Sequence, residues 1–472
     1  MTVTIPFDNS YARLPDRFYT RMKPTPVQKP ELLKFNAELA SEMGIAHGKD
    51  EELAEIFSGN LIPEGAEPLA QVYAGHQFGG FSPRLGDGRA NLLGEALHAK
   101  IRRDIHLKGS GPTPYSRMGD GRAWLGPVLR EYVISEAMHA LGIPTTRALA
   151  AVATGEPVYR EEGSLPGAVI ARTASSHIRV GTFQYFWARR DVPALESLFE
   201  HVVERHYPQA SDPLDLLNAV MANQAALVAK WMSIGFIHGV MNTDNTTISG
   251  ETIDYGPCAF MDKYDERTVF SSIDHHGRYA YCNQPNVIVW NMAQFASTLV
   301  ALMPNGDHAV EIFTKSVQTM PNLIKKEWLK LFGQKIGISD ATEADTAIIG
   351  DLLKRMQNGG ADFTNTFRAL AEGKAAGQFK NPDEFREWER IWRQRLKSEP
   401  DPESAMLKAN PAYMPRNHRI ELMIQSAVYG DLKPFERLLS VFSRPYESQP
   451  DAEYLKLPPE PHEVVQRTFC GT

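Results

Sequence analysis

The sequence changes character at about residue 193, and this change constrains the fold more than any other feature. Before it, short segments bounded by turn residues predict strands, at 104–108, 148–153 and 168–172. After it, apolar residues recur at helical spacing, and they predict helices at 193–206, 213–234, 286–303, 308–333, 383–397 and 417–441. Strands followed by long helices predict an α+β fold of two lobes with a cleft between them.

Two helices are also expected in the first part, at 31–43 and 128–141, and a polar segment interrupts the helical part at 238–262. We therefore expect four regions. They are an N-terminal extension packed on the lobes (1–70), a strand-rich N-lobe (71–185), a mainly helical C-lobe with polar loops (186–445) and an extended C-terminal tail (446–472).

Composition excludes several classes of protein. The chain has 472 residues, of which 43% are hydrophobic, so it can bury a large core. A net charge of -7 argues against a generally basic nucleic-acid binder, and no apolar run is long enough to span a membrane. Three cysteines do not build a disulfide scaffold, and Met1–Ser10 shows no targeting signal, so we expect a cytoplasmic protein.

The tetrapeptide Gly-Asp-Gly-Arg occurs twice, at 86–89 and at 119–122. Glycines allow backbone N–H groups to approach a phosphate closely, and the arginine adds positive charge. The second copy precedes a predicted helix, whose N-terminus favours anions. The alternative interpretation is a tight hairpin turn for the first copy, and a helix cap supplied by Asp120 for the second.

Lys108 ends a predicted strand and is followed by a glycine turn, a position from which a lysine can reach nucleotide phosphates. Glu131 and Glu136 lie on the next helix, and either could pair with this lysine as in protein kinases. Arg172 and Arg179 flank a polar turn and could hold a phosphate chain from two sides. Each of these residues could equally be an ordinary solvated charge.

The segment 238–256 carries the most specific pattern. His238-Gly239 and Asn245 have the spacing of the catalytic loop of kinase-like phosphotransferases, and Asp254 begins an Asp-Tyr-Gly triplet at the place of the kinase metal site. Asn245 and Asp254 are candidate Mg²⁺ ligands. Val240 stands where a kinase needs its base aspartate, which makes Asp244 the nearest carboxylate that could replace it.

Three kinds of protein remain as alternative interpretations of the chain: a phosphotransferase, a nucleotide-binding scaffold and a metal hydrolase. A phosphotransferase that moves the γ-phosphate is disfavoured by Val240, and a non-catalytic nucleotide-binding scaffold is disfavoured by the pair Asn245 and Asp254. A metal hydrolase would depend on Asp274-His275-His276, which lacks the helical spacing of a zinc-binding motif and is more simply a polar loop.

Taken together, these residues resemble the selenoprotein O family, called YdiU in bacteria. The matching segments span most of the chain: AGHQFG (74–79), LGDGRA (85–90), HLKGSGPTPYSRMGDGRA (106–123), REYVISEAMHALGIPTTRAL (130–149), HGVMNTDN (238–245), DYGP (254–257), GRYAYCNQP (277–285) and NPAYMPRNH (410–418). The resemblance implies a protein-kinase-like fold and Mg²⁺-dependent transfer of AMP from ATP to Ser, Thr or Tyr hydroxyls of proteins. The resemblance to bacterial members also implies transfer of UMP from UTP with Mn²⁺.

The resemblance further implies that ATP binds inverted relative to ordinary kinases, so that its α-phosphate faces the acceptor. Asp244 matches the proton acceptor, and Asn245 and Asp254 match the Mg²⁺ ligands. Glu131 matches the partner of the strand lysine. Arg172 and Arg179 match arginines that hold the buried end of the phosphate chain. The full set of residues that match nucleotide contacts is Gly86, Gly88, Arg89, Lys108, Asp120, Gly121, Arg172, Arg179 and Asp254.

The C-terminus matches the place where animal members of the family carry selenocysteine, and here the residue is Cys470. The family is linked to redox control through a disulfide from this tail. Cys282, in the loop after the metal site, is the plausible partner that the resemblance suggests. The alternative is a free thiol, because disulfides in reducing compartments are usually transient.

Overall fold

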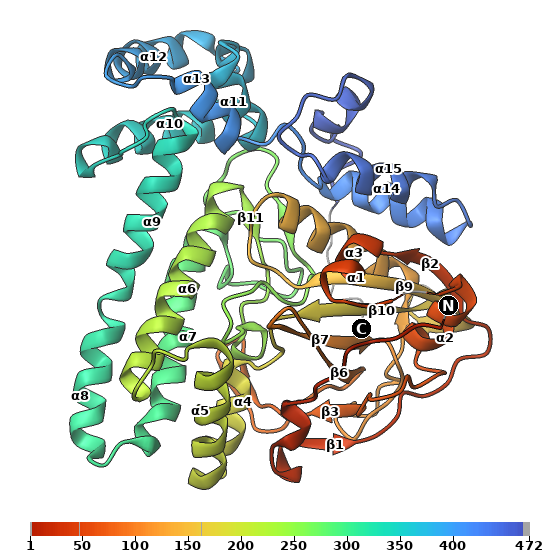
Figure 1. The fold of residues 1–472 in the computed structure, drawn as a ribbon. Coiled ribbons are helices and arrows are strands. Elements are labelled where there is room, and N and C mark those ends of the chain that lie inside the picture. The colour runs from red at the N-terminus through yellow and green to blue at the C-terminus, as the bar shows by residue number, and fades with distance from the viewer. Residues whose placement is uncertain (1, 47, 162, 466–472) are drawn as a thin grey trace.

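The computed structural model describes residues 2–46, 48–161 and 163–465. One part is a large sheet with helices on both faces, and the other is almost entirely helical (Figure 1). Strands therefore precede the long helices along the chain, as the sequence predicts for an α+β fold.

The sheet has eight strands in the described residues, and every pairing in it is antiparallel. The strands predicted at 104–108, 148–153 and 168–172 are confirmed within β7, β9 and β10. In spatial order the strands are β1 (Tyr19–Arg21), β3 (Leu69–Gln71), β6 (Ala90–His98), β7 (Ile101–Lys108), β10 (Gly163–Ala174), β9 (Arg147–Arg160) and β2 (Glu31–Phe35), with β8 (Ala123–Trp124) also paired to β10.

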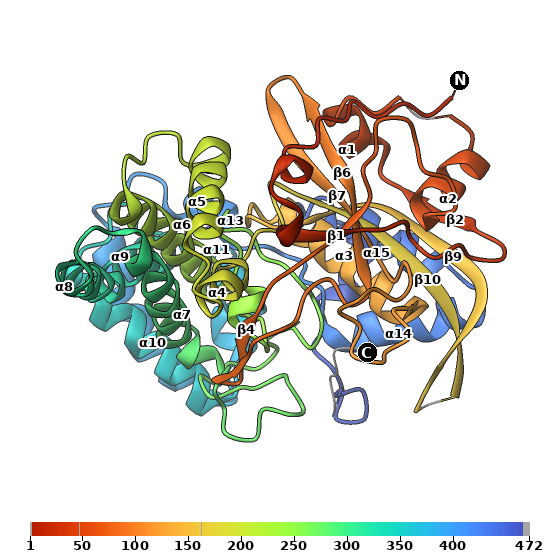
Figure 2. The same cartoon turned by 90° about the horizontal axis from the view of Figure 1, so that it is seen from below.

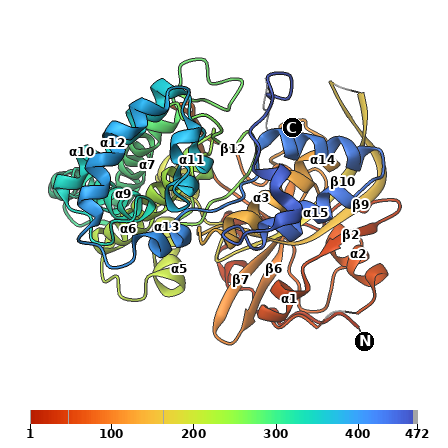
Figure 3. The same cartoon turned by 90° about the horizontal axis from the view of Figure 1, so that it is seen from above.

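Side chains alternate between the two faces of the sheet, and each face has its own core. Val169 and Ala171 of β10 pack towards α1 (Ala37–Glu42) and α2 (Asp50–Ser58). Ala168 and Ile170 are buried on the other face, in the core that contains α3 (Leu125–Ala140), α14 (Asn417–Val428) and α15 (Lys433–Phe442). Figure 3 shows these two groups of helices on opposite sides of the sheet.

The helical part is built around α6, which packs against α7 and α9 (Figure 1). A second layer, from α10 to α13, covers one end of these helices and buries Trp388 and Trp392. The helices of this part are α4 (Val180–Trp187), α5 (Val192–His206), α6 (Pro213–Ser233), α7 (Gln284–Leu299), α8 (Gly306–Val317), α9 (Met320–Lys335), α10 (Thr346–Gly359), α11 (Phe363–Ala371), α12 (Pro382–Leu396) and α13 (Pro402–Ala409).

Three predicted helices differ from the structure. The expected helix at 31–43 is wrong in its first half, because residues 31–35 pair with β9 as strand β2 and the side chain of Asn36 then caps α1. The stretch 308–333 is two helices, α8 and α9, and Pro321 occupies the first turn of the second. The stretch 417–441 is also two helices, separated by Gly430 at φ +89°.

Short elements connect the two parts. Strands β11 (Phe236–Ile237) and β12 (Ala259–Phe260) enclose the polar segment, which contains the 3-10 turn η3 (Thr243–Asn245). A separate hairpin of β4 (Gly75–Gln77) and β5 (Gly80–Ser82) leaves the large sheet and lies beside α4 and α7 (Figure 2). The described part of the predicted tail is not wholly extended, because it forms the 3-10 helix η8 (Pro450–Lys456), which buries Ala452 and Leu455.

Candidate active site

Strand β7 sorts its side chains by the period of two that strands impose. Ile105 and Leu107 enter the core beneath α1 and α2. Asp104, His106 and Lys108 therefore project from the opposite face, and all three are buried. The sequence could predict this alternation, but it could not show that the polar face is covered.

Glu131 of α3 joins two cations on that face. Lys108 Nζ donates to Glu131 Oε2 at 2.6 Å, and Arg172 of β10 donates to Glu131 Oε1 at 2.9 Å. Burial alone would raise the pKa of Glu131, but the adjacent Lys108 and Arg172 lower it below its ordinary value. Glu131 is therefore a carboxylate that holds both cations in place.

The competing glutamate has a different partner. Glu136 accepts hydrogen bonds from Arg147 at 2.8 and 2.9 Å, from the backbone N–H of Ala148 and from the side chain of Asn36. It thus fastens α3 to the start of β9 and α1. Of the two glutamates that the sequence leaves open, Glu131 is the one that contacts Lys108.

Asp254 completes this cluster from the polar segment. Its Oδ1 accepts a short hydrogen bond from Lys108 Nζ, 146 residues away along the chain. Burial would raise the pKa of Asp254, but Lys108, Arg89 and Arg172 hold it well below its usual range, so the side chain is charged. Its backbone lies in the left-handed region at φ +68°, an uncommon conformation for a residue other than glycine.

The first Gly-Asp-Gly-Arg turn lies next to the cluster. A Cβ on Gly86 would lie 2.5 Å from the ring of Tyr115, so the turn requires glycine there. Asp87, which the sequence indicated only as a turn residue, is buried, and its Oδ2 accepts from Gln71 N at 3.0 Å and lies 3.2 Å from His106 Nε2. Arg89 closes the turn, and its backbone carbonyl accepts from Gly109 N.

Arg179 precedes α4 and is 4% exposed. Its guanidinium lies over the ring of Tyr73, with 4.1 Å between Cζ and the ring centroid, and 3.6 Å from Asp87 Oδ1. Nε and Nη1 of Arg179 have no hydrogen-bond acceptor among the described residues. Buried donors are rarely left unsatisfied, so this side chain fits an anionic ligand such as a phosphate.

The second copy of the motif is not part of these contacts. Asp120 pairs with Arg160 at 2.8 Å and accepts from the N–H of Arg122, near the exposed end of the β9–β10 hairpin. Gly121 packs against Gly111, where a Cβ would lie 2.2 Å from backbone atoms. Asp120 caps its own loop in the structure, and its predicted nucleotide contact stays a prediction.

Asp244, the candidate base, is 8% exposed. Its Oδ2 accepts from Gln77 Nε2 of the β4–β5 hairpin at 3.1 Å, whereas Oδ1 is buried without a hydrogen-bond partner among the described residues. Burial raises the pKa of Asp244 to about 6. A carboxylate with one held oxygen and one unengaged oxygen can accept a proton from a hydroxyl placed beside it.

Asn245 and Asp254 are the residues that would hold the Mg²⁺ that the resemblance implies. The amide of Asn245 donates to Val240 O at 3.1 Å, so its oxygen can serve as a ligand, and both residues supply the hard oxygen atoms that Mg²⁺ prefers. The described chain contains no group of three or more His, Cys, Asp or Glu able to hold a metal ion. The pair fits Mg²⁺ only if phosphate oxygens and water complete the coordination shell.

The other candidate residues from the sequence lie outside this cluster, and Asp274 accepts hydrogen bonds from the backbone of its own loop. Asp274 accepts from the N–H groups of Arg278 and Tyr279, while His275 and His276 are exposed, as expected for a polar loop. Cys282 is exposed and forms no disulfide with the described chain. Cys470 lies outside the described residues, so the pairing of these cysteines stays a prediction.

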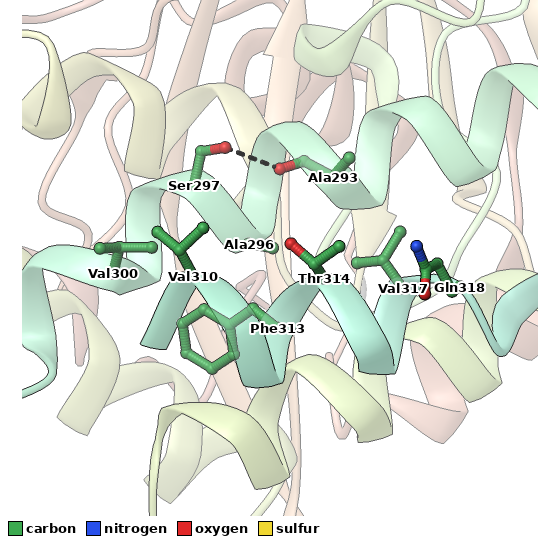
Figure 4. A pocket seen from close by; sticks show the side chains of 9 residues that line it. All are labelled: Ala293, Ala296, Ser297, Val300, Val310, Phe313, Thr314, Val317 and Gln318. Carbon is green, nitrogen blue, oxygen red and sulfur yellow. Dashed lines mark hydrogen bonds between the residues drawn. The ribbon is translucent and has the colours of Figure 1, made fainter. Parts of the chain in front are cut away.

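A hollow between α7 and α8 is not a second candidate for phosphate binding. Figure 4 shows its lining, in which the drawn hydrogen bond runs within α7 from Ser297 to Ala293 O at 3.0 Å. The lining contains no charged side chain.

No helix in the described ranges is long and apolar enough to cross a membrane.

Comparison with known proteins agrees with this geometry. A family model described as protein adenylyltransferase SelO matches residues 1–443. The chain is 60% identical over 473 residues to the protein nucleotidyltransferase YdiU of Ruegeria sp. (strain TM1040), with 100% of both chains covered. It is 56% identical over 486 residues to the YdiU protein of Rhizobium meliloti (strain 1021), with 99% of each covered. The chain therefore belongs to the SelO family of protein adenylyltransferases.

Proposed function

We propose that this nucleotidyltransferase transfers AMP from ATP to Ser, Thr or Tyr hydroxyls of other proteins, with Mg²⁺ as its metal. Its relatives are named protein nucleotidyltransferases, and the family model is described as an adenylyltransferase. The single observation that supports the proposal most is Arg179, a buried guanidinium 3.6 Å from Asp87, whose Nε and Nη1 have no hydrogen-bond acceptor within the described part of the chain. A triphosphate with a buried end would supply acceptors for these donors.

In this proposal the arrangement is that of a protein-kinase-like site between a strand-rich and a helical lobe. Lys108, Arg172 and Arg179 neutralise phosphate charge, and Glu131 positions the first two of them. The metal, held by Asn245 and Asp254, would supply further charge neutralisation when bound. Asp244 accepts the proton of the acceptor hydroxyl through its unengaged oxygen.

Transfer of the γ-phosphate is the competing activity. Val240 in place of a carboxylate speaks against it, since that position carries the proton acceptor of kinases. The same site would also accommodate UTP with Mn²⁺. The cations Lys108, Arg172 and Arg179 would contact the phosphate chain, which ATP and UTP share, and not the base. With few cysteines in the chain, we place the reaction in the reducing cytoplasm.

The test uses ATP labelled at either the α- or the γ-phosphate, incubated with the protein, Mg²⁺ and a cell extract. Label from the α position alone on extract proteins is expected. Label from the γ position would make the protein a kinase that works without the usual aspartate. ATP binding without transfer of either label would favour the scaffold. Asp244→Asn is expected to lose transfer while it still binds ATP.

A further inference from the structure

His106 lies between the two arginines that the proposed function assigns to the phosphate chain. It is buried, and the antiparallel register of β7 and β10 places it directly opposite Arg172. Arg172 Nε donates to His106 Nδ1 at 3.2 Å. The other ring nitrogen, Nε2, lies 3.2 Å from Asp87 Oδ2, and Asp87 Oδ1 lies 3.6 Å from Arg179 Nη1. One imidazole thus contacts the first arginine directly and the carboxylate that faces the second.

These contacts define the protonation state of the ring. A guanidinium can only donate, so Nδ1 is the acceptor and the single ring proton lies on Nε2, next to Asp87. Burial lowers the pKa of His106, although Asp87 acts in the opposite direction, so the ring is neutral at neutral pH. A neutral ring holds Arg172 without cancelling its charge. That charge stays available for an anionic ligand.

A second histidine keeps the ring in this orientation. The rings of His106 and His177 are stacked, with 4.3 Å between their centroids and 19° between their planes. His177 is itself held by Asp104, whose Oδ2 lies 2.9 Å from His177 Nδ1 and accepts from its backbone N–H at 2.8 Å. His106 therefore cannot turn away from Arg172 without disrupting this stack.

We propose that His106 is a positioning residue that orients the guanidinium of Arg172, and through Asp87 that of Arg179, towards the phosphate chain of the nucleotide. The inference rests on the phosphate-binding part of the proposed function and adds a residue to it. Glu131 holds Nη1 of Arg172 at 2.9 Å, and His106 holds Nε, so the guanidinium is fixed from α3 and from β7. Without His106, the buried Nε loses its acceptor and the guanidinium is free to turn.

The test measures the binding of ATP, with Mg²⁺ present, by titration calorimetry. His106→Asn places its amide oxygen near the position of Nδ1 and can still accept from Arg172, whereas the longer side chain of His106→Gln places its amide near Nε2. We expect the Kd for ATP to rise roughly ten-fold in His106→Gln, the effect of losing a hydrogen bond to a charged group, and less than about three-fold in His106→Asn. Adenosine has no phosphate, so its Kd should stay the same in both variants.

His106→Leu has no acceptor at all and should behave as His106→Gln, which keeps the comparison possible if the glutamine variant does not fold. The matched control is His177→Gln, because His177 is as buried as His106 but its ring hydrogen-bonds to Asp104 instead of an arginine. It should lower the melting temperature, while the Kd for ATP changes less than about two-fold.

A wild-type Kd for ATP in His106→Leu or His106→Gln would overturn the inference. So would equal losses in His106→Asn and His106→Gln, an equal loss in His177→Gln, or a matching loss of adenosine binding, since each would assign His106 to the stability of the sheet alone. The expected pattern of affinities without α-label on any protein would refute the proposed transfer and leave the role of His106 standing.

Discussion

Glu131→Gln tests whether the charge cluster, rather than α3 as a whole, prepares the nucleotide site. The substitution keeps the shape of the side chain but removes the charge that Lys108 and Arg172 share. The side chain of Glu131 is 4% exposed, so neither cation can exchange it for water without rearrangement. The amide of glutamine can accept from one of the two cations, and its NH₂ group must face the other.

The magnitude follows from the two contacts. A hydrogen bond to a charged group contributes about 1.5–3 kcal/mol, and breaking a buried ion pair costs about 3–5 kcal/mol of stability. If only the contact to Lys108 is felt in the transition state, about 1.5–3 kcal/mol corresponds to a loss of roughly ten- to hundred-fold in kcat/KM for ATP. Thermal unfolding should also begin at a lower temperature, because Lys108 and Arg172 lose the buried negative charge between them.

The control is Glu136→Gln on the same helix, which breaks the pair with Arg147 and leaves Lys108 untouched. It should lower the stability, because Glu136 accepts several hydrogen bonds, while kcat/KM for ATP changes less than about two-fold, because none of those bonds involves Lys108. The assays are α-label transfer to extract proteins at varied ATP and a thermal melt of each variant. Equal losses of kcat/KM in both variants, or none in Glu131→Gln, would refute the role of the cluster.

Four further predictions follow from particular contacts. Gly75→Ala places a Cβ 2.5 Å from Asp244 Oδ1, so it should reduce transfer more than about ten-fold while the affinity for ATP is retained. The control, Gly350→Ala, has open space around the new Cβ and should leave transfer unchanged. Similar activity of the two variants would contradict this role of Gly75. Asp254→Ala should abolish Mg²⁺-dependent transfer, and wild-type rates would disprove its role as a ligand. Burial lowers the pKa of Lys335 to about 7, so the folded state binds fewer protons than the unfolded state between pH 7 and 10.5. Stability relative to Lys335→Met should therefore rise by about 1.4 kcal/mol per pH unit above pH 7 in urea unfolding, and a flat difference would show that Lys335 stays charged. Mild oxidation should link Cys282 to Cys470 in non-reducing peptide maps, and altered activity without that linked peptide would refute the pairing.

Several features of the site could be predicted from the sequence because they depend on local pattern. The alternation along β7 indicates that Lys108 leaves one face of a strand, and the spacing of His238, Asn245 and Asp254 identifies the polar segment. The long helices follow from apolar periodicity, although turns such as that at Gly430 divide two of the predicted helices. Periodicity cannot detect a break that leaves the apolar spacing nearly unchanged.

Other features could not be predicted, because they depend on which segments pack together. Asp87 looks like a turn residue in the sequence, and only the docking of β3 and α4 around it makes it a buried carboxylate beside His106 and Arg179. Gln77 gives no signal of its own either. Its contact with Asp244 joins residues 167 positions apart, which no local pattern encodes.

The sequence by itself determined the order of strands and helices, the chemical types of residue in the polar segment and the family. Tertiary structure decided which of Glu131 and Glu136 holds Lys108, and it buried Arg179 with donor atoms that no acceptor in residues 2–46, 48–161 and 163–465 satisfies. The physical reason is the range of the forces involved. Backbone and periodic preferences act between near neighbours, whereas ion pairing and desolvation depend on side chains that meet only after the sheet and helices have packed.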